Sequence, residues 1–380
     1  MKAHWYPTDD LPSFEQQLMS LAQDGRVRTI LVFACDQNGW LKADLDPVLQ
    51  AIDKPVLGGV FPQVIHEGVS HEKGCLVVAL PFAVKHGLIT GLSDPDADYD
   101  QQLMEQMETL IDTTVSQQSL MVWVDGLSSR IGSLIESIFY TLGLSFNLFG
   151  GGAGSLSFEQ KPCLFDNNGM VMDAALIISL PIATAMGVSH GWQAVSEPLQ
   201  VTSAEANTVK TLNWRPAFDV YKELVDSMTG QSLTPEAFFD TAKAYPFGLS
   251  RIGSEIVVRD PLKVTQEGHM LCVGEVPEGS FVKILHGTHQ SLIAAAAETK
   301  ALALENQKHD DQIQLAFLVN CISRVLFHGE HLSEELAAVL MDQPSIGVMT
   351  LGEIANNGED FIEFYNKTMV MALMMRYQES

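Results

Sequence analysis

Basic residues are scarce in this chain of 380 residues. It has 22 lysine and arginine residues against 47 aspartate and glutamate residues, which gives a net charge of −25. Nucleic-acid binding depends on lysine and arginine to neutralise phosphates, and anionic membranes attract the same side chains. The charge therefore argues against nucleic acid and membrane as partners. A basic protein or a small neutral or cationic ligand fits this surface better.

Cysteine is also scarce, with five residues at scattered positions and no Cys-x-x-Cys pair. This pattern excludes a zinc knuckle and a thioredoxin motif, and it argues against a disulfide framework. The N-terminus lacks the apolar segment of a signal peptide. The most apolar stretch, residues 174–189, is too short to cross a membrane and contains Pro181. We therefore expect a cytoplasmic protein.

Two catalytic signatures, HExxH and GxxxxGK[ST], are missing from the sequence, and no spacing suggests a Cys-His-Asn set. We therefore expect that the protein is not an enzyme. Hydrophobic residues make up 46% of the chain and charged residues 18%, a balance that is typical of globular proteins. A chain of this length has room for about two or three domains.

Three stretches of the chain share one plan: an apolar strand, a helical pattern, a second strand marked by glycine, a turn and a closing apolar strand. The opening strands are predicted at 29–35, 120–125 and 315–321, and the closing strands at 74–80, 173–180 and 368–373. The glycines follow the opening strand by about 25 residues, which suits a βαβ crossover. We interpret the run at 150–154 as a glycine turn. The apolar runs are continuous, which indicates strands that are covered on both faces.

The stretch between the second and third units, from about 196 to 285, has short alternating runs separated by turn residues and predicts a β-rich insert. Helices are predicted at 214–228 and 291–308. The fold class is therefore α/β, with mixed sheets built from repeated βαβ-like units and a β-rich middle insert. We divide the chain near residue 195, into an N-terminal region 1–195 and a C-terminal region 196–380.

Several motifs in these units, taken in order, resemble the FIST family of signalling proteins. They are Asp125-Gly126, the glycine run 149–154, the segments 187–192 and 197–202, the Trp-Arg-Pro-Ala element at 214–221, and the C-terminal segments 321–324, 350–354 and 366–368. The resemblance covers nearly the whole chain and implies a FIST N-terminal and a FIST C-terminal region. It also implies a stand-alone bacterial sensor that acts on a histidine kinase or another signalling protein.

One branch of the family, the NosP-like proteins, binds haem and senses nitric oxide, which makes His190 and Trp192 candidates for a haem site. As a neutral imidazole, His190 could ligate the iron of a non-covalent haem, and Trp192 could stack on the porphyrin. The alternative is a histidine that is satisfied by a carbonyl group.

A second set of candidates suits a small organic metabolite such as an amino acid. Ligands of open α/β sheets bind at the carboxyl ends of strands, where Cys35, Asp125 and Cys321 occupy equivalent places. The candidate ligand-binding residues are Asp125, Arg130, Arg215, Cys321, Arg324 and Glu353. Helix capping by Asp125 and structural ion pairs of the arginines are the alternative. A scaffold protein without a ligand also remains open.

Overall fold

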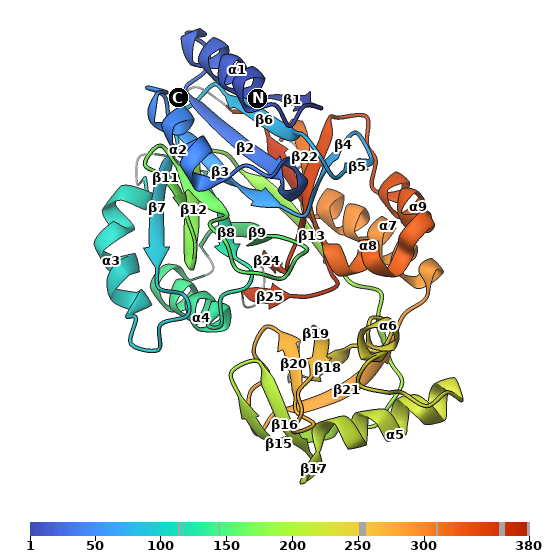
Figure 1. Cartoon of the computed structure of the whole chain (residues 1–380). Helices are drawn as coiled ribbons and strands as arrows, with labels where there is room; N and C mark the ends of the chain where they lie inside the picture. The colour runs from blue at the N-terminus through green and yellow to red at the C-terminus, as the bar shows by residue number, and fades with distance from the viewer. Residues whose placement is uncertain are drawn as a thin grey trace.

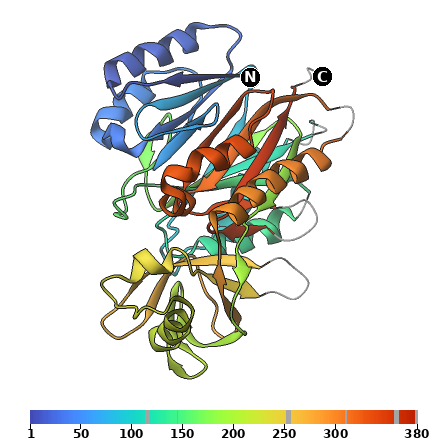
Figure 2. The same cartoon turned by 90° about the vertical axis from the view of Figure 1, so that its right-hand side faces the viewer.

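The structure is a computed structural model that describes residues 1–112, 115, 117–143, 145–250, 256–308, 311–356 and 362–377. The chain forms an α/β body of three mixed sheets and a smaller β-barrel that lies below it in the view of Figure 1. The turned view in Figure 2 shows the same two parts, with both termini in the α/β body. In the described ranges, no helix is long and apolar enough to cross a membrane.

The three sheets of the body have the same strand order. The first sheet runs β1 (Lys2–Tyr6), β6 (Cys75–Leu80), β2 (Thr29–Cys35), β3 (Val56–Phe61), β10 (Leu164–Asp166) and β11 (Gly169–Val171). The second runs β7 (Lys85–Thr90), β12 (Ala174–Leu180), β8 (Ser119–Asp125), β9 (Asn147–Ala153), β24 (Glu353–Ala355) and β25 (Glu363–Tyr365). The third runs β13 (Thr184–Ser189), β26 (Met369–Met375), β22 (Ile313–Cys321), β23 (Ser345–Thr350), β4 (Gln63–His66) and β5 (Val69–His71).

Each sheet is built around one of the three predicted units, which confirms the α/β fold class. The opening strand pairs in parallel with the glycine-marked strand and antiparallel with the closing strand, as β2 does with β3 and β6. The hairpin at the end of each sheet comes from a different unit. The hairpin β4–β5 follows β3 in the chain but pairs with β23, β10–β11 pairs with β3, and β24–β25 pairs with β9. The three units therefore exchange hairpins in a closed cycle.

We predicted a turn at the glycine run 150–154, and this prediction is wrong. Most of the run belongs to strand β9. A Cβ atom on Gly150 would lie 1.7 Å from the backbone oxygen of Val122 in the neighbouring strand. Equivalent glycines in the other sheets, Gly58 and Gly347, would place a Cβ 1.8 and 2.1 Å from a neighbouring backbone oxygen. Glycine is therefore needed for the close approach of two parallel strands.

Helices cover the outer face of each sheet, and an aromatic cluster fills the space between the sheets. The helices are α1 (Leu11–Gln23) and α2 (Lys42–Gln50) on the first sheet, α3 (Tyr99–Leu110) and α4 (Ile131–Leu142) on the second, and α7 (His289–Glu305), α8 (Ile322–His328) and α9 (Leu332–Ala338) on the third. Phe33, Phe61, Trp123 and Phe317 are buried between the sheets, with ring centroids 5.0–6.0 Å apart. Strands covered on both faces are continuously apolar, as the sequence shows.

The predicted β-rich insert is a closed antiparallel barrel. Six strands close the barrel: β15 (Leu199–Glu205), β16 (Thr208–Leu212), β20 (Met270–Val273), β19 (Val257–Val264), β18 (Phe247–Ser250) and β21 (Phe281–His286). The short strands β14 (Gln193–Ala194) and β17 (Arg215–Pro216) pair outside this ring, and α5 (Ala217–Thr229) and α6 (Phe238–Ala242) pack on the barrel. Residue 195, where we divide the chain, lies between β14 and β15.

Candidate ligand-binding cleft

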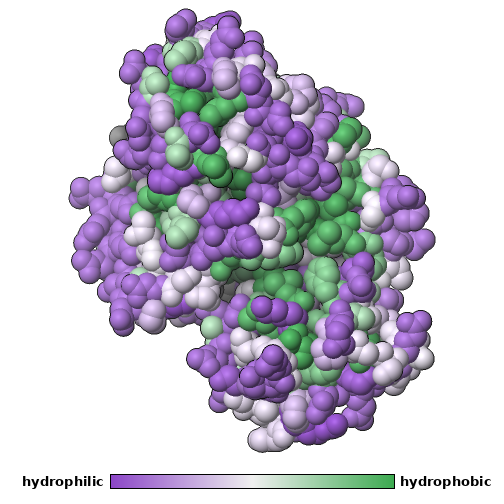
Figure 3. All heavy atoms as spheres, viewed as in Figure 1, coloured by the Kyte–Doolittle hydropathy of each residue, from purple (hydrophilic) through white to green (hydrophobic). Residues whose placement is uncertain are grey.

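A cleft of about 520 Å³ lies between the α/β body and the barrel. In Figure 3, apolar side chains gather where these two parts meet. The body contributes residues 126–128, which follow β8, and Leu351, which follows β23. The barrel contributes Leu262 and Lys263 of β19 and residues 271–274 at β20, and Phe239 of α6 also lines the cleft. The volume is in the range of small-molecule sites, which are typically about 300–1,000 Å³.

The cleft lies at the carboxyl end of the opening strand β8, and ligands of open α/β sheets bind at such strand ends. Cys35, Asp125 and Cys321 are the last residues of β2, β8 and β22, so the predicted equivalence of these positions is confirmed. Cys321 lines a small extension of about 10 Å³ together with Ser323 and Asn366. This extension shares Phe158, Phe239, Leu262, Val273 and Leu351 with the cleft, so it forms the floor of the cleft.

Buried polar contacts join the barrel to the body beside this floor. Asp260 of β19 accepts a 2.6 Å hydrogen bond from Ser323 and lies 3.1 Å from the Lys367 ammonium nitrogen. The backbone N–H of Asp260 donates to the Asn366 side chain at 3.2 Å. Asp260 and Lys367 are fully buried. Removing a charge from such a pair leaves its partner unpaired in a region of low dielectric constant, so these contacts hold the two parts together.

Two titratable groups lie at and behind the floor: Cys321 lines it, and Glu353 lies in the polar core behind it. Burial, followed by the nearby Glu353 carboxyl, raises the pKa of the Cys321 thiol to about 12. Burial raises the pKa of Glu353 to about 8, although Thr350 and the backbone N–H of Thr368 donate hydrogen bonds to its carboxyl oxygens. At neutral pH Cys321 is therefore a neutral thiol, and Glu353 is mostly a neutral acid.

The third wall of the cleft is residues 155–163, which follow β9; we call this the wall segment. Asp125 anchors it, because its carboxylate accepts hydrogen bonds from Gln160 Nε2 at 2.8 Å, from the Asp173 N–H at 2.8 Å and from the Leu127 N–H at 3.1 Å. Phe158 in this segment has a φ of 53°, in the left-handed region that bulky residues rarely adopt. Phe158 and Gln160 line the cleft.

A second cavity of about 220 Å³ lies on the opposite side of the wall segment. Its lining includes three carboxylates and two lysines: Asp36, Asp125, Glu159, Lys42 and Lys161. Ser155 in the wall segment donates a 2.6 Å hydrogen bond to Asp36. The wall segment therefore separates an apolar cleft from a charged cavity, and a displacement of this segment would change both.

Two protein-family models match the chain in sequence: the FIST N domain over residues 28–215 and the FIST C domain over residues 217–356. The chain is a FIST domain protein. FIST domains form a sensory domain family in signal transduction. No protein in a search of curated sequences matches the chain. In the FIST protein the junction of the two matches lies between β17 and α5, and β25 and β26 lie beyond the second match but complete two of the sheets.

The candidate ligand residues of the FIST protein do not come together in one site. Arg130 donates hydrogen bonds to the Asp94 carbonyl and to Tyr99, not to Asp125. Arg215 lies on the barrel, where it is exposed and pairs with Glu223 at 2.8 Å. Neither arginine is among the described residues that line the cleft.

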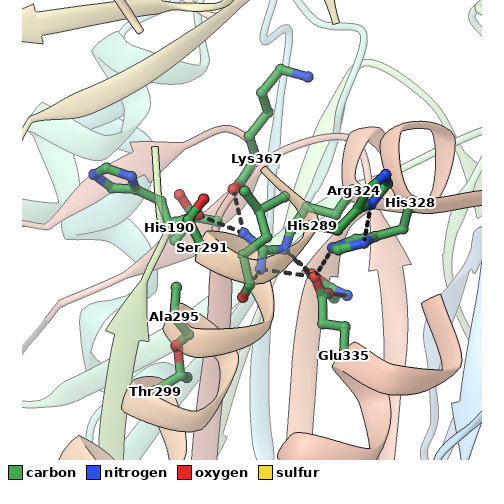
Figure 4. Close-up of polar contacts among 12 residues, drawn as sticks. His190, His289, Ser291, Ala295, Thr299, Arg324, His328, Glu335 and Lys367 are labelled. Carbon is green, nitrogen blue, oxygen red and sulfur yellow. Dashed lines mark hydrogen bonds and ion pairs between the residues drawn. The ribbon is translucent and has the colours of Figure 1, made fainter. Parts of the chain in front are cut away.

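Arg324 is structural in this FIST protein, as Figure 4 shows. The guanidinium is fully buried and pairs with Glu335 at 2.9 Å. It also donates to the backbone oxygens of His190, Lys367 and Leu292 at 2.8–3.0 Å. Burial alone would raise the pKa of Glu335, but the Arg324 charge and hydrogen bonds from His328 and Arg324 lower it to about 2. These contacts agree with the alternative of a structural ion pair.

Glu353 comes from the third unit of the chain but lies in β24, which pairs with β9 of the second unit. It is fully buried. The hydrogen bonds from Thr350 and Thr368 place its carboxyl behind the cleft floor rather than in the cleft. The exchange of hairpins between units moves this residue to another sheet, which the sequence pattern does not show.

His190 and Trp192 are packed inside the protein. His190 is 7% exposed, and its Nδ1 accepts a 2.9 Å hydrogen bond from the Trp192 backbone N–H. Burial lowers the pKa of the imidazole to about 4, so it is neutral at pH 7. Trp192 is 3% exposed, and its ring contacts the Lys367 ammonium group and the edge-packed Phe327 ring. Both side chains are buried against other protein groups rather than facing an open cavity, so their surroundings do not fit a haem.

Most residues that line the cleft were not among the candidates. Leu262, Leu271 and Val273 belong to alternating barrel strands, a pattern that indicates a half-buried sheet and not a site. Residues 187–191 also match the Gly-x-Ser-x-Gly pattern of hydrolases. That pattern needs a sharp turn from a strand to a helix, whereas Ser189 ends β13, is buried and donates to Glu298. Ser189 is therefore not positioned as a nucleophile.

Proposed function

We propose that this FIST domain protein is a sensor whose small organic ligand binds in the cleft between the α/β body and the barrel. The observation that carries the proposal is the cleft itself, a space of about 520 Å³ whose apolar walls come from the body, the barrel with its helix α6, and the wall segment. A few polar groups, Ser128, Gln160 and Asn207, are placed among these walls. Such a combination is typical of small-molecule sites.

A ligand in this cleft would contact both parts of the protein and the wall segment at once. It would therefore favour one arrangement of the barrel, the body and the wall segment over others. We propose that a signalling partner, such as a histidine kinase, recognises this arrangement and that the protein is not itself an enzyme. The lining residues in the described ranges include neither a carboxylate nor an imidazole, the groups that most often act as general bases.

The haem and nitric oxide version of the sensor has weaker support. It rests on the family resemblance, whereas His190 and Trp192 are buried and packed against other protein groups. We therefore favour an organic ligand in the cleft. The amino acid version, held by Asp125, Arg215, Arg324 and Glu353, requires groups that lie in separate places in the fold.

Thermal denaturation in the presence of a metabolite panel tests the proposal. A ligand of the folded state stabilises it by about 2.7 kcal/mol at a hundredfold excess over Kd. We expect at least one compound to raise the Tm of the native protein, and Leu271→Trp, which fills the cleft, to abolish this shift. Phe281→Trp is the matched control, because Phe281 lies on the barrel, is 48% exposed and does not line the cleft. An undiminished shift in Leu271→Trp would place the ligand elsewhere, and no shift with any compound would contradict a sensor.

A further inference from the structure

We infer that the cleft selects a ligand with an apolar body and one anionic group, such as a monocarboxylate, and discriminates against ligands that carry an ammonium group. This inference rests on the proposed function, since it names the ligand class of the same cleft. It differs from the amino acid hypothesis, because an amino acid carries an ammonium group as well as a carboxylate.

The walls of the cleft are suited to an apolar body. Seven large apolar side chains line it: Leu127, Phe158, Phe239, Leu262, Leu271, Val273 and Leu351. They come from the body, the wall segment and the barrel, so they surround the space rather than form one flat patch. Transfer of apolar surface from water into such a space is favourable in proportion to the area that is buried.

A lysine that is itself exposed to solvent is among the residues that line the cleft. Among the described residues that line it, Lys263 alone carries a charge at neutral pH. No carboxylate in the described part of the chain forms an ion pair with Lys263, although acidic residues outnumber basic ones by 47 to 22. A ligand carboxylate would give this ammonium group a charge-assisted hydrogen bond.

An ammonium group on the ligand has no such partner in the cleft. The nearby carboxylate of Asp125 lies behind the wall segment and already accepts hydrogen bonds from Gln160 and two backbone N–H groups. Asp260 does not line the cleft: it is fully buried, and its Oδ2 contacts Ser323 and Lys367. A ligand ammonium would lose its water without gaining a counter-ion and would be repelled by Lys263, which disfavours binding.

Four probes with the same phenylpropyl body and different polar ends test this inference. They are 3-phenylpropionate, 3-phenylpropanol, 3-phenylpropylamine and phenylalanine, each titrated into the full-length protein by isothermal calorimetry at pH 7. We expect the acid to bind about tenfold more tightly than the alcohol, and the amine and the amino acid to bind more weakly than the alcohol. The preference for the acid should decrease at high salt, because Lys263 is exposed to solvent.

Lys263→Gln and Lys283→Gln form a matched pair of variants. Lys283 lies on β21 of the same barrel but does not line the cleft, so its loss changes the net charge equally. We expect Lys263→Gln to bind the acid and the alcohol equally, and Lys283→Gln to keep the native preference.

The outcomes separate the ligand class from the proposed function. If the alcohol, the amine and the acid bind with equal affinity and Leu271→Trp abolishes all three, the cleft is a binding site but its selectivity for anions is refuted. Tighter binding of phenylalanine or the amine than of the acid, or an unchanged preference in Lys263→Gln, also refutes it. If no probe binds while another compound gives a thermal shift that Leu271→Trp removes, this ligand class is wrong and the sensor proposal stands.

Discussion

Replacing Arg324 with alanine should be among the most destabilising single substitutions in this protein. The guanidinium and the Glu335 carboxylate are both fully buried, and their nearest atoms are 2.9 Å apart. Removing one partner of a buried ion pair costs about 3–5 kcal/mol, because the other charge remains without compensation. His328, whose Nε2 lies 2.6 Å from Glu335, supplies part of that compensation when protonated.

The loss of backbone contacts adds to this effect. Arg324 donates to three backbone oxygens, those of His190, Lys367 and Leu292, and each buried acceptor without a donor costs about 1–3 kcal/mol unless water replaces the side chain. The total is comparable with the whole stability of a typical domain, about 5–15 kcal/mol. We therefore expect Arg324→Ala to lose more than about 4 kcal/mol or to fail to fold.

Urea denaturation followed by tryptophan fluorescence measures this effect, with two variants for comparison. Arg215→Ala removes an exposed ion pair and should change the free energy of unfolding by less than about 1 kcal/mol. Arg324→Lys keeps the charge but has three donors in place of the planar guanidinium, so its loss should be intermediate. It remains measurable if the alanine variant does not fold.

The pH dependence gives an independent check. The pKa of Glu335 is lowered to about 2 in the folded protein, so its stabilising contribution is present above its ordinary value of 4.5 and is lost as the pH falls through about 2. The difference in stability between the native protein and Arg324→Lys should therefore narrow below pH 4. A loss of less than about 1 kcal/mol in Arg324→Ala, equal to that of Arg215→Ala, would refute a structural role for Arg324.

Three other predictions concern single residues. The pKa of Glu353 is raised to about 8, so the native protein should lose stability relative to Glu353→Gln as the pH rises from about 4.5 to 8, measured by urea denaturation; a constant difference would contradict this. Trp214 is 78% exposed, has a φ of 60° and ends a two-residue turn. Trp214→Gly should therefore raise the free energy of unfolding by about 1 kcal/mol. A variant less stable than the native protein would show that the indole is packed. Haem added to the purified protein should give only the absorbance of free haem, whereas a sharp Soret band that is lost in His190→Ala would establish a haem site.

The sequence predicts the three α/β units well, because long apolar strands covered on both faces leave a strong signal. The predicted strand at 29–35 agrees with β2, and the predicted helix at 291–308 agrees with α7 to within three residues. The exchanged hairpins were missed, since strands such as β10 and β24 have only three residues and no periodicity. Their partners lie in other units, so pairing depends on tertiary structure that local patterns do not record.

The site was harder to predict than the fold for a related reason. Charged residues attract attention in a sequence, but Arg324 and Glu353 prove to be buried structural groups. The cleft is formed mainly by ordinary apolar side chains such as Leu271 and Leu351, which become a site only because the barrel and the body leave a space between them. Of the predicted positions, the strand ends Asp125 and Cys321 come nearest to it, because topology alone places them there.

The cyclic exchange of hairpins also has a consequence during protein synthesis. The hairpin β4–β5 emerges early from the ribosome, but its partner strand β23 belongs to the third unit. About 280 residues separate the end of β4 from the start of β23, so at roughly 5–20 residues per second the hairpin waits for roughly 15–60 s. Throughout that time an apolar strand edge is exposed to other chains, which makes the nascent protein a natural client for chaperones that shield unpaired strands.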